Sequence, residues 1–396
     1  MTSDRLRLLY LSNAFPPGVI GRFPSLCSHA SHATETRMAQ ALSRQAEIST
    51  VGLLPAQVWD KLEPRDDSLG LEHELLLWER KPELWHRWKS WRELHNFYLE
   101  KTDREGQPDF VLVRNMTAVF NCFVRWLRRQ SPRPMIVLIL ADSGALGQAL
   151  SLARRVRYIF KPMQTLENRA VLWYDACLAF GIKTRRYFKP RGVPWLWMPS
   201  AFNFAFDPPP CATNDGPIRF GYFGGLSHES AVLPMVRAFL GAQVPGSLHI
   251  CGFGGLSDTL AELAQQHPNI HFDGLLPTQA ACLAWAQKVD VLINPRLPLW
   301  ENSFPSKIFE FGITGKAILS TRIGGVDEVL REDGLYLDAD GLESSLRHRL
   351  REVAEMDRAD LQRRGAAIRT RILKEFNRSE ERRVGKECRS RWSPYH

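Results

Sequence analysis

Short apolar runs alternate with helix-length segments along the first half of the chain. Runs of this length are typical of buried strands, and they occur at LRLLYLS (6–12), EISTVGLL (47–54), DFVLVRN (109–115) and MIVLILAD (135–142). A loop containing Pro and Gly follows the first run, and a helical pattern follows near residues 30–44. This alternation predicts a parallel sheet covered by helices.

A second series of the same kind begins after a proline-rich segment. Residues 190–217 contain seven prolines and little periodicity, which indicates an interdomain linker. The apolar runs after it are IRFGYFGG, SLHICGFGG, NIHF, DVLINP, KAILST and GLYLD. We therefore predict an α/β chain with two doubly wound, Rossmann-like domains facing a cleft. Residues 1–189 form the first domain, 190–216 the linker and 217–377 the second domain, and ligands should lie at the carboxyl ends of the strands.

The last segment, residues 378–396, resembles the translation of a common sequencing adapter, and we treat it as an artefact. We expect the native C-terminus to be missing. The segment holds six of the 52 Lys and Arg residues and three of the 43 acids, so the net charge of +9 falls to +6 without it. A moderate positive charge suits a partner with phosphates, nucleic acid or an anionic membrane, and it does not choose among them.

Cysteine usage and hydropathy predict a cytoplasmic protein. Outside the artefactual tail, six cysteines remain without a CxxC spacing, at positions 27, 122, 177, 211, 251 and 282. They indicate reduced thiols and no zinc site. The N-terminus lacks the apolar region of a signal peptide, and the longest apolar run, 135–141, is too short to span a bilayer. Any membrane contact should be peripheral, at the inner face.

A tryptophan-rich segment, residues 75–101, leaves two interpretations open. Leu84, Trp88, Trp91 and Tyr98 fall on one helical stripe, with Arg and Lys between them. The helix could pack its aromatic side chains on the domain, or it could be a basic surface helix at a membrane interface.

Glycine and small polar residues recur where the second series of strands ends, in YFGGLS, CGFGG, NPRLPLWENSFPSK and STRIGG. Glycine permits the backbone to approach a ligand closely. A helix beginning near Pro305 would point amide groups and the positive end of its dipole at an anion such as a pyrophosphate, and Lys307 adds a full charge. Glu310 shares that helix face and could accept two ribose hydroxyls, although an exposed ion pair between Lys307 and Glu310 is the alternative.

These elements, FPSKIFEFGITGKAILST preceded by GYFGGLS, HICGFGG, PNIHFDGLLP and VDVLINP in this order, carry a family resemblance. Over residues 217–340 the chain resembles the group 1 family of GT-B glycosyltransferases, which are retaining enzymes that use nucleotide sugars. The first half is similar more loosely, through LLYLSNAFPPG and MPSAFNFAF.

The resemblance implies roles for single residues. Glu310 corresponds to the second Glu of the family's E-x7-E motif and would hold the donor ribose, while the first Glu falls at Asn302, next to Glu301. The family's basic pair aligns with Gly225 and Ser230, and neither is basic here. Loss of one donor to a developing anion typically costs about 10²- to 10³-fold in rate. Either a basic residue compensates, with Lys307 favoured over Arg296 and Arg322, or the protein is slow or inactive.

The predicted site has three parts. The catalytic candidates are Lys307, Asn302 and Asp142. The donor-binding candidates are Gly224, Gly225, Ser227, Gly252, Gly254, Arg296, Glu301, Phe304, Pro305, Ser306, Glu310 and Arg322. The acceptor-side candidates are Gly18, Gly21 and His29.

Other motifs give no cofactor. The sequence DAD at Asp338–Asp340 has the form of a metal-binding DxD, but it precedes a helix, where Asp is an ordinary N-cap. The GFGG at 252–255 lacks the third Gly and the distant acid of a dinucleotide fingerprint. We predict neither a metal nor another cofactor.

We therefore expect a metal-independent, retaining glycosyltransferase. It would move a sugar from a nucleotide diphosphate donor to a glycan or lipid-linked acceptor held by the first domain, in bacterial surface polysaccharide synthesis. A catalytically weakened GT-B binding or scaffold protein and a nucleotide-sugar epimerase are the alternatives. The basic residues are dispersed and no known nucleic-acid-binding module is visible, so nucleic acid is not an expected partner.

Overall fold

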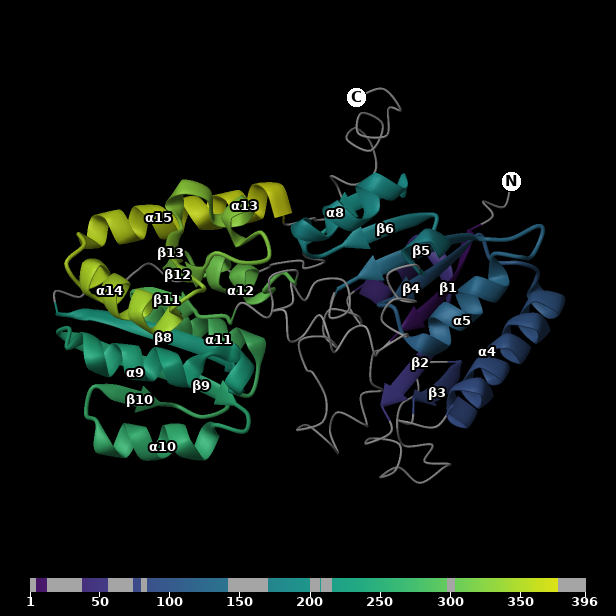
Figure 1. Cartoon of the computed structure of the whole chain (residues 1–396). Helices are drawn as coiled ribbons and strands as arrows, with labels where there is room; N and C mark the ends of the chain where they lie inside the picture. The colour runs from purple at the N-terminus through teal and green to yellow at the C-terminus, as the bar shows by residue number, and fades with distance from the viewer. Residues whose placement is uncertain are drawn as a thin grey trace. The chain divides into compact units, whose positions relative to one another are not determined.

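In a computed structural model of the protein, the structure describes residues 5–12, 38–55, 74–79, 84–141, 170–199, 207, 216–297 and 303–376. The chain divides into two compact units, Met1–Ala201 and Phe202–His396. Each unit contains its own parallel sheet with helices packed on it, which confirms the predicted fold class (Figure 1).

The sheet of the first unit has seven strands in the order β3-β2-β1-β4-β5-β6-β7, and every neighbouring pair is parallel. The strands are β1 (Leu6–Ser12), β2 (Ala46–Pro55), β3 (Leu75–Glu79), β4 (Phe110–Arg114), β5 (Met135–Leu140), β6 (Ala176–Ala179) and β7 (Trp195–Trp197). From β1 the chain runs outward to β3 and then returns to β4 on the other side of β1. The order therefore reverses between β1 and β4, as in a doubly wound sheet.

Helices α4 (Leu84–Glu105) and α5 (Ala118–Leu127) pack on one face of this sheet. In α4, the residues predicted to share one stripe differ in their burial. Tyr98 is buried and shares the buried face with Leu94, as expected if the aromatic side chains pack on the domain, whereas the Trp88 side chain is 44% exposed. The Arg92 guanidinium lies 5.1 Å above the Trp88 ring. Trp88 therefore belongs to the outer face of α4.

Strand β7 lies inside the segment that its prolines mark as a linker. It is the edge strand of the first sheet, with Trp195 opposite Cys177 of β6. Pro194 and Pro199 flank the strand, and prolines are tolerated at the ends of an edge strand because they interrupt no pairing there. The first unit consequently extends beyond residue 190.

The sheet of the second unit has six parallel strands in the order β10-β9-β8-β11-β12-β13. They are β8 (Ile218–Gly225), β9 (Gly246–Phe253), β10 (Ile270–Phe272), β11 (Val291–Asn294), β12 (Ala317–Thr321) and β13 (Leu335–Leu337). All six correspond to predicted strands. The order reverses between β8 and β11, so the carboxyl ends of these two strands mark the expected ligand position.

Two groups of helices pack on the second sheet. Helices α9 (Val232–Ala242) and α14 (Leu342–Ala354) share a buried core with one face. On the other face, Phe223 of β8 contacts α11 (Gln279–Trp285) through Trp285, with ring centroids 6.2 Å apart. It also contacts α12 (Lys307–Ile313) through Phe311, at 4.6 Å.

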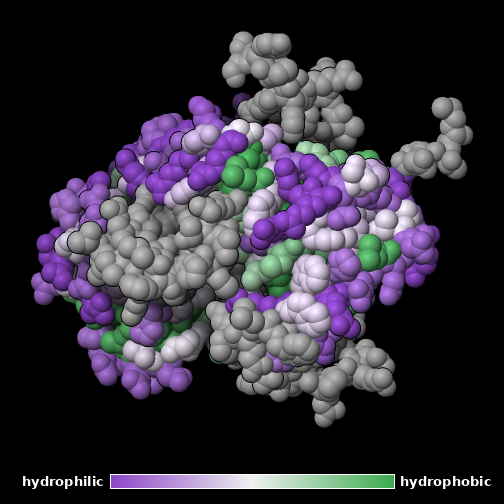
Figure 2. Space-filling view, turned by 45° about the vertical axis from the view of Figure 1, so that its right-hand side comes forward, coloured by the Kyte–Doolittle hydropathy of each residue, from purple (hydrophilic) through white to green (hydrophobic). Residues whose placement is uncertain are grey.

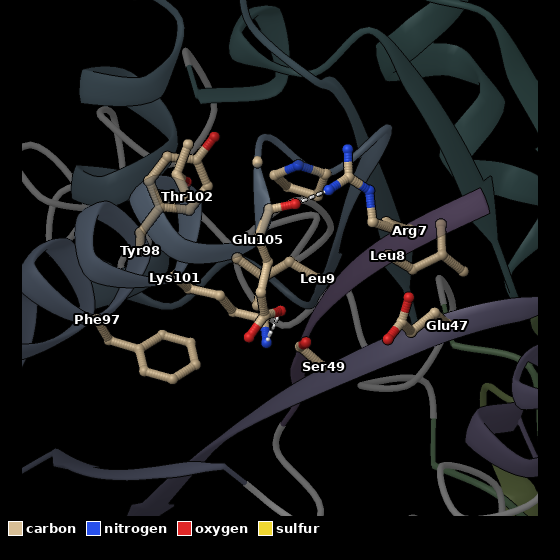
Figure 3. Close-up of a pocket in the computed structure, with 12 residues that line it drawn as sticks. Arg7, Leu8, Leu9, Glu47, Ser49, Phe97, Tyr98, Lys101, Thr102 and Glu105 are labelled. Carbon is tan, nitrogen blue, oxygen red and sulfur yellow. Dashed lines mark hydrogen bonds and ion pairs between the residues drawn. The ribbon is translucent and has the colours of Figure 1, made fainter. Parts of the chain in front are cut away.

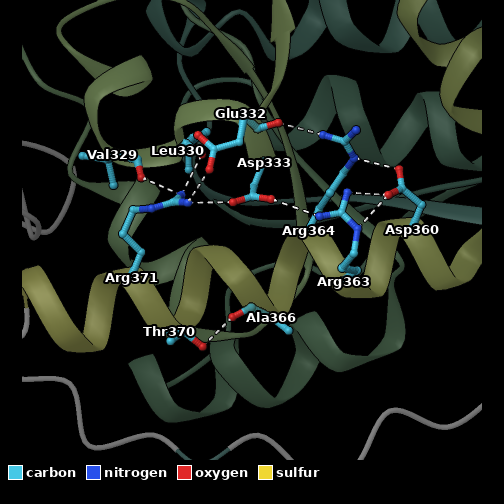
Figure 4. Close-up of polar contacts among 10 residues, drawn as sticks. All are labelled: Val329, Leu330, Glu332, Asp333, Asp360, Arg363, Arg364, Ala366, Thr370 and Arg371. Carbon is cyan, nitrogen blue, oxygen red and sulfur yellow. Dashed lines mark hydrogen bonds and ion pairs between the residues drawn. The ribbon is translucent and has the colours of Figure 1, made fainter.

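A buried carboxylate fastens the helix α15 (Arg358–Arg371) to the turn before β13 (Figure 4). Asp333 is 4% exposed, and its two oxygens accept hydrogen bonds from Arg371 Nη2 at 2.7 Å and Arg363 Nη1 at 3.4 Å. Arg371 Nη1 also donates to the carbonyl oxygen of Leu330 at 2.8 Å. This network is structural, since each of its charges is satisfied within the unit.

In each sheet, an aspartate at the amino end of one strand accepts a hydrogen bond from a backbone amide of the neighbouring strand. Asp175 accepts from the amide of Ile136 at 2.9 Å and pairs with Arg133 at 2.6 Å. Asp290 accepts from the amide of Arg219 at 2.8 Å and pairs with Arg358 at 3.0 Å. Burial opposes ionisation of both groups, but these hydrogen bonds and cations outweigh it and lower the pKa of each carboxyl.

Candidate functional site

The start of α12 meets the carboxyl end of β8 in the second unit, at the position where the strand order reverses. Lys307 is the first residue of α12, and its ammonium Nζ donates to the Tyr222 hydroxyl at 2.7 Å. The same ammonium lies 4.7 Å from the centroid of the Tyr222 ring. A hydrogen bond and a cation–π contact together fix the ammonium at the end of the strand.

Gly224 makes room for this lysine. Its φ is +144°, and a Cβ added there would lie 1.9 Å from Lys307 Nζ and 2.3 Å from Lys307 Cε. Any side chain at position 224 would therefore displace the ammonium. The sequence predicted that glycine at this strand end lets the backbone approach a ligand; in the structure the Lys307 side chain lies in that space.

Tyr222 belongs to the site and was not predicted from the sequence. It is 1% exposed, and its hydroxyl donates to the carbonyl oxygen of Gly225 at 2.9 Å. Burial by itself would raise the pKa of Tyr222, but the nearby charges of Lys307 and Arg296 and the bond from Lys307 lower it. Two cations thus act on one phenol. The sequence signal for Tyr222 was its position, two residues before the Gly-Gly pair that ends a central strand.

Arg296 follows β11, the neighbour of β8 in the sheet. Its amide donates to Thr321 Oγ1 at 2.9 Å, which fixes its backbone to the end of β12. Arg322 lies one strand further from the reversal point, where its guanidinium covers the Tyr336 ring at 4.3 Å. Of the two arginines proposed as phosphate ligands, Arg296 therefore follows the strand next to β8, whose end Lys307 contacts, and Arg322 follows the strand after that.

Glycines at the end of β9 bring backbone segments together. Gly252 has a φ of +146°, and a Cβ there would lie 1.9 Å from the carbonyl oxygen of Gly224. A Cβ on Gly254 would lie 2.3 Å from the carbonyl oxygen of Leu226. These two glycines therefore allow the ends of β8 and β9 to approach each other closely.

The positions that align with the family's basic pair differ from each other. Gly225 is exposed, and a Cβ there would meet nothing within 4 Å. Ser230 is 4% exposed; its hydroxyl donates to the carbonyl oxygen of Gly225 at 2.9 Å and accepts from the amide of Ser227 at 3.1 Å. Ser230 thus closes the loop after β8 on itself, and Ser227 is exposed as part of that loop.

The entrance to α12 differs from the predicted open helix end. The helix begins at Lys307 rather than near Pro305, and Phe304 and Pro305 are buried. The amides of Ile308 and Phe309 donate to the carbonyl oxygens of Pro305 and Ser306, at 3.0 and 3.1 Å. Since these two amides are already bonded, Lys307 is the group at this helix end that we expect to attract an anion.

Glu310 lies one turn into α12. Its Oε1 accepts a hydrogen bond from Gln279 Nε2, in the first turn of α11, at 2.8 Å. Glu310 is half-buried. The Lys307 ammonium and the Glu310 carboxylate thus have separate partners, Tyr222 and Gln279, on two neighbouring structural elements.

Several predicted residues lie outside the residues that the structure describes: Gly18, Gly21, His29, Asp142, Glu301 and Asn302. The expected N-cap role of the DAD motif is wrong, because the N-cap of α14 is Gly341 in a left-handed conformation. Among the described residues, no cluster of three or more His, Cys, Asp or Glu side chains could hold a metal ion. None of the helices in the described ranges is long and apolar enough to cross a membrane.

A separate pocket lies in the first unit, at the amino ends of β1 and β2 (Figure 3). Arg7, Glu47 and the end of α4 line it, and Lys101 pairs there with Glu105 at 2.6 Å and Glu74 at 3.0 Å. Ligands of doubly wound sheets bind at the carboxyl ends of the strands. This pocket therefore lies at the wrong edge of its sheet for a donor or acceptor site.

Comparison with known proteins identifies the second unit. Residues 217–355 match the sequence model of the family described as "Glycosyl transferases group 1". The match covers most of the second unit and less than half of the chain. No curated protein matches the chain. The family assignment agrees with the geometry, because the match spans the strands β8 to β13 and the helix α12 that carries Lys307 and Glu310.

Solved structures show the fold of the whole chain. Sucrose-phosphate synthase from Thermosynechococcus elongatus aligns with a TM-score of 0.67 and 15% identity, covering 94% of this chain and 95% of its own. The apo form of the lipopolysaccharide outer core galactosyltransferase WaaB aligns with a TM-score of 0.57 and 13% identity, covering 94% and 97%. Anabaena HepE, in complex with UDP and glucose, aligns with a TM-score of 0.59 and 14% identity, covering 94% and 96%. The chain therefore has the GT-B fold.

Proposed function

We propose that this glycosyltransferase binds a nucleotide diphosphate sugar in its second unit and transfers the sugar to a glycan or lipid-linked acceptor held by its first unit. The observation that carries the proposal is the Lys307 ammonium at the carboxyl end of β8, in space that Gly224 leaves open. An ammonium that is held in place before the reaction stabilises the diphosphate that accumulates charge as the sugar departs.

Three residues contact the donor in this proposal, and two others position them. Lys307 binds the diphosphate, and Tyr222 positions the lysine through the 2.7 Å hydrogen bond. Glu310 accepts hydrogen bonds from the ribose, and Gln279 orients that carboxylate. Arg296 supplies the second positive charge, replacing the one that is lost at Gly225 and Ser230. Asn302 and Glu301 remain candidates for contact with the donor sugar.

The rest of the reaction rests on the family. Transfer with retention of configuration, without a metal ion, is the family's chemistry, and Lys307 would take over the charge neutralisation that a metal supplies elsewhere. Galactosyltransferase WaaB acts on the lipopolysaccharide outer core, and HepE is seen with UDP and glucose. By analogy we propose a role in bacterial surface polysaccharide synthesis in the cytoplasm.

A thermal-shift panel of UDP-, GDP- and ADP-sugars, followed by an assay of nucleotide release, tests this function. We expect one nucleotide to stabilise the protein, and the Glu310→Ala variant to lose the shift. Turnover with a glycan or lipid-linked acceptor should release the nucleotide. A protein that no nucleotide sugar stabilises would contradict the proposal.

A catalytically weakened binding protein is the second candidate, and Ser230 favours it. In the family a basic residue occupies this position, whereas here the serine hydroxyl is committed to the loop at Gly225 and Ser227. Nucleotide binding without turnover, for every acceptor tested, would favour this candidate. Conversion of a free nucleotide sugar without any acceptor would instead favour an epimerase.

A basic segment supports peripheral contact with an anionic membrane. Residues 183–191 hold five cations and no acid, at Lys183, Arg185, Arg186, Lys189 and Arg191. They lie between β6 and β7 of the first unit, anchored by the buried Phe188. Among the residues coloured in Figure 2, apolar side chains form small separate patches between hydrophilic ones. Each cation near an anionic surface contributes about 1 kcal/mol.

Vesicles test this contact. The protein should sediment with vesicles containing phosphatidylglycerol and not with neutral ones, and replacement of Arg185, Lys189 and Arg191 by Gln should abolish the difference. Equal binding to both kinds of vesicle would contradict it.

A further inference from the structure

The turn between β12 and α13 (Val326–Leu330) lies beside both ends of the segment that joins β11 to α12. The structure describes residues 295–297 and 303–306 of this segment. Arg296 lies near its start, and Lys307 follows its end as the first residue of α12. These are the two cations that the proposed function assigns to the diphosphate. A single turn is therefore close to the backbone on which both cations depend.

Thr321 holds the start of the segment. It is the last residue of β12 and is 0% exposed, and its hydroxyl oxygen accepts the hydrogen bond from the Arg296 amide at 2.9 Å. Directly before it, the buried side chains of Asn294 and Ser320 lie opposite each other, and Asn294 Nδ2 donates to Ser320 Oγ at 2.9 Å. Buried polar groups that are hydrogen-bonded to one another fix each other's positions. The backbone of Arg296 is thus held by side chains at the ends of β11 and β12.

Gly324 lies against the end of the segment. A Cβ added to this glycine would lie 2.2 Å from the carbonyl oxygen of Ser303 and 3.1 Å from Cα of Phe304. Phe304 is buried, and its ring centroid lies 5.2 Å from that of Phe309 in α12. Only glycine lets the backbone of Ser303 and Phe304 come this close to the turn. That backbone leads into Lys307, three residues after Phe304.

The turn itself is buried and hydrogen-bonded. The amide of Ile323 donates to the carbonyl oxygen of Thr321 at 2.9 Å, and the amide of Val326 donates to that of Ile323 at 3.0 Å. The two residues between, Gly324 and Gly325, have φ values of +62° and +95°, and a turn with two positive φ angles favours glycine. Ile323 is 3% exposed and Val326 is 0% exposed. The turn is therefore a fixed support for the segment beside it.

We propose that the turn 321–325 positions the two cations that bind the diphosphate. Thr321 acts through Arg296, and Gly324 acts through Lys307. The effect on binding rests on the proposed function. Neither Thr321 nor Gly324 contacts the donor, so both are positioning residues. Cations that are already in place stabilise a developing negative charge more than cations that must first be ordered.

Amide hydrogen exchange tests the role of Thr321 without any ligand. In the full chain, Thr321→Val removes the acceptor and keeps the shape of the side chain. The Arg296 amide should therefore exchange about tenfold faster, measured by NMR, because its hydrogen bond is lost. Thr321→Ser keeps a hydroxyl and should restore the protection. Unchanged protection of the Arg296 amide in Thr321→Val would overturn the positioning role of Thr321.

Titration with UDP, GDP and ADP tests the effect of Thr321 on binding. For the nucleotide that binds wild type best, Thr321→Val should bind about tenfold more weakly, the effect of losing a hydrogen bond to a charged group, and Thr321→Ser should bind as wild type does. In the Arg296→Ala background, Thr321→Val should cause no further loss, because a positioning residue acts only through the residue that it positions. A further tenfold loss in that background would overturn the link between Thr321 and Arg296.

Gly324→Ala tests the other end of the segment. It should weaken binding of the same nucleotide about tenfold, and it should cause no further loss in the Lys307→Ala background. Gly192→Ala is the matched control, since Gly192 has a similar φ of +66° and nothing lies within 4 Å of its Cβ. It should bind as wild type does. Equal affinity of the folded Gly324→Ala and Gly192→Ala variants would overturn the role of Gly324.

Failure of wild type to bind any of the three diphosphates would contradict the proposed function and the role of the turn in binding. The exchange rates of the Arg296 amide in Thr321→Val and Thr321→Ser need no ligand. They therefore decide separately whether Thr321 positions Arg296.

Discussion

The two sheets share a topology but fill the carboxyl ends of their central strands differently. In the second unit, β8 ends at Gly224 and Gly225, and the Lys307 ammonium occupies the space beside Gly224. In the first unit, β4 ends at Arg114, which is 2% exposed and lies under the Phe180 ring at 5.1 Å. At the end of β8 the cation is partly exposed and bonded to Tyr222, whereas at the end of β4 the cation is enclosed in the core.

This difference predicts which strand end performs chemistry. A half-exposed lysine can transfer its hydrogen bond from a tyrosine to a phosphate, whereas a buried guanidinium under an aromatic ring is held by its packing. The substitutions that follow should therefore separate activity from stability.

The largest effect should come from Gly224→Ala. The new methyl group would overlap Lys307 Nζ and displace the ammonium, so the turnover number should fall about 10²- to 10³-fold, as for Lys307→Ala. Gly225→Ala is the matched control, because nothing lies within 4 Å of its Cβ, and it should change turnover little. Similar rates for the two alanine variants, with both folded by circular dichroism, would remove Gly224 from the account.

Glu310 should control affinity more than turnover. Glu310→Ala should weaken donor binding about tenfold or more, measured by isothermal titration, because hydrogen bonds to a charged group are lost. Glu310→Gln keeps an oxygen that can accept from Gln279 and so separates the helix contact from the charge. If Glu310→Gln binds the donor as wild type does, the carboxylate charge has no part in binding.

Arg114→Ala should show the opposite pattern. Removal of a large buried side chain leaves a cavity, and losses of this kind typically cost about 2–5 kcal/mol in the free energy of unfolding. Thermal unfolding should therefore report a lower Tm for the first unit, while donor affinity stays unchanged. A loss of donor affinity equal to that of Glu310→Ala would contradict the contrast between the two strand ends.

Acid should weaken both units through their amino-end aspartates. The pKa of Asp175 and of Asp290 is lowered in the folded chain from an ordinary value of 3.8. The stability that each charged carboxylate contributes is therefore complete above about pH 3.8 and is lost as the pH falls through the lower folded value. Asp290→Asn should reduce the Tm at pH 7 and reduce it less as the pH falls below 4. A difference that is constant with pH would show that charge is not the cause.

The fold was predictable because buried parallel strands are nearly continuous apolar runs, and all six strands of the second unit have this character. Strands β3, β6 and β7 were not, because LLLWE, ACLA and WLW are short, and prolines flank the last of them. The prolines indicated a linker at this segment. The pairing of Trp195 with Cys177, which makes it a strand, is visible only in the tertiary structure.

The site was predictable where a residue's function depends on its own chemistry. Lys307 and Glu310 stand out as charges in an apolar segment, whereas Tyr222 reads as a core aromatic until its hydroxyl is seen to meet Lys307. The contact of Gln279 with Glu310 joins segments that are 31 positions apart in the chain, and no local pattern encodes it.

The central claim is that Lys307 binds the diphosphate of the donor, and the most direct test compares ligands that differ only in phosphate number. For the base that binds best, the nucleoside, monophosphate and diphosphate are titrated into wild type and Lys307→Ala. The account predicts that wild type binds the diphosphate most tightly and that Lys307→Ala loses most of this preference while still binding the nucleoside. An undiminished preference for the diphosphate in Lys307→Ala would contradict it.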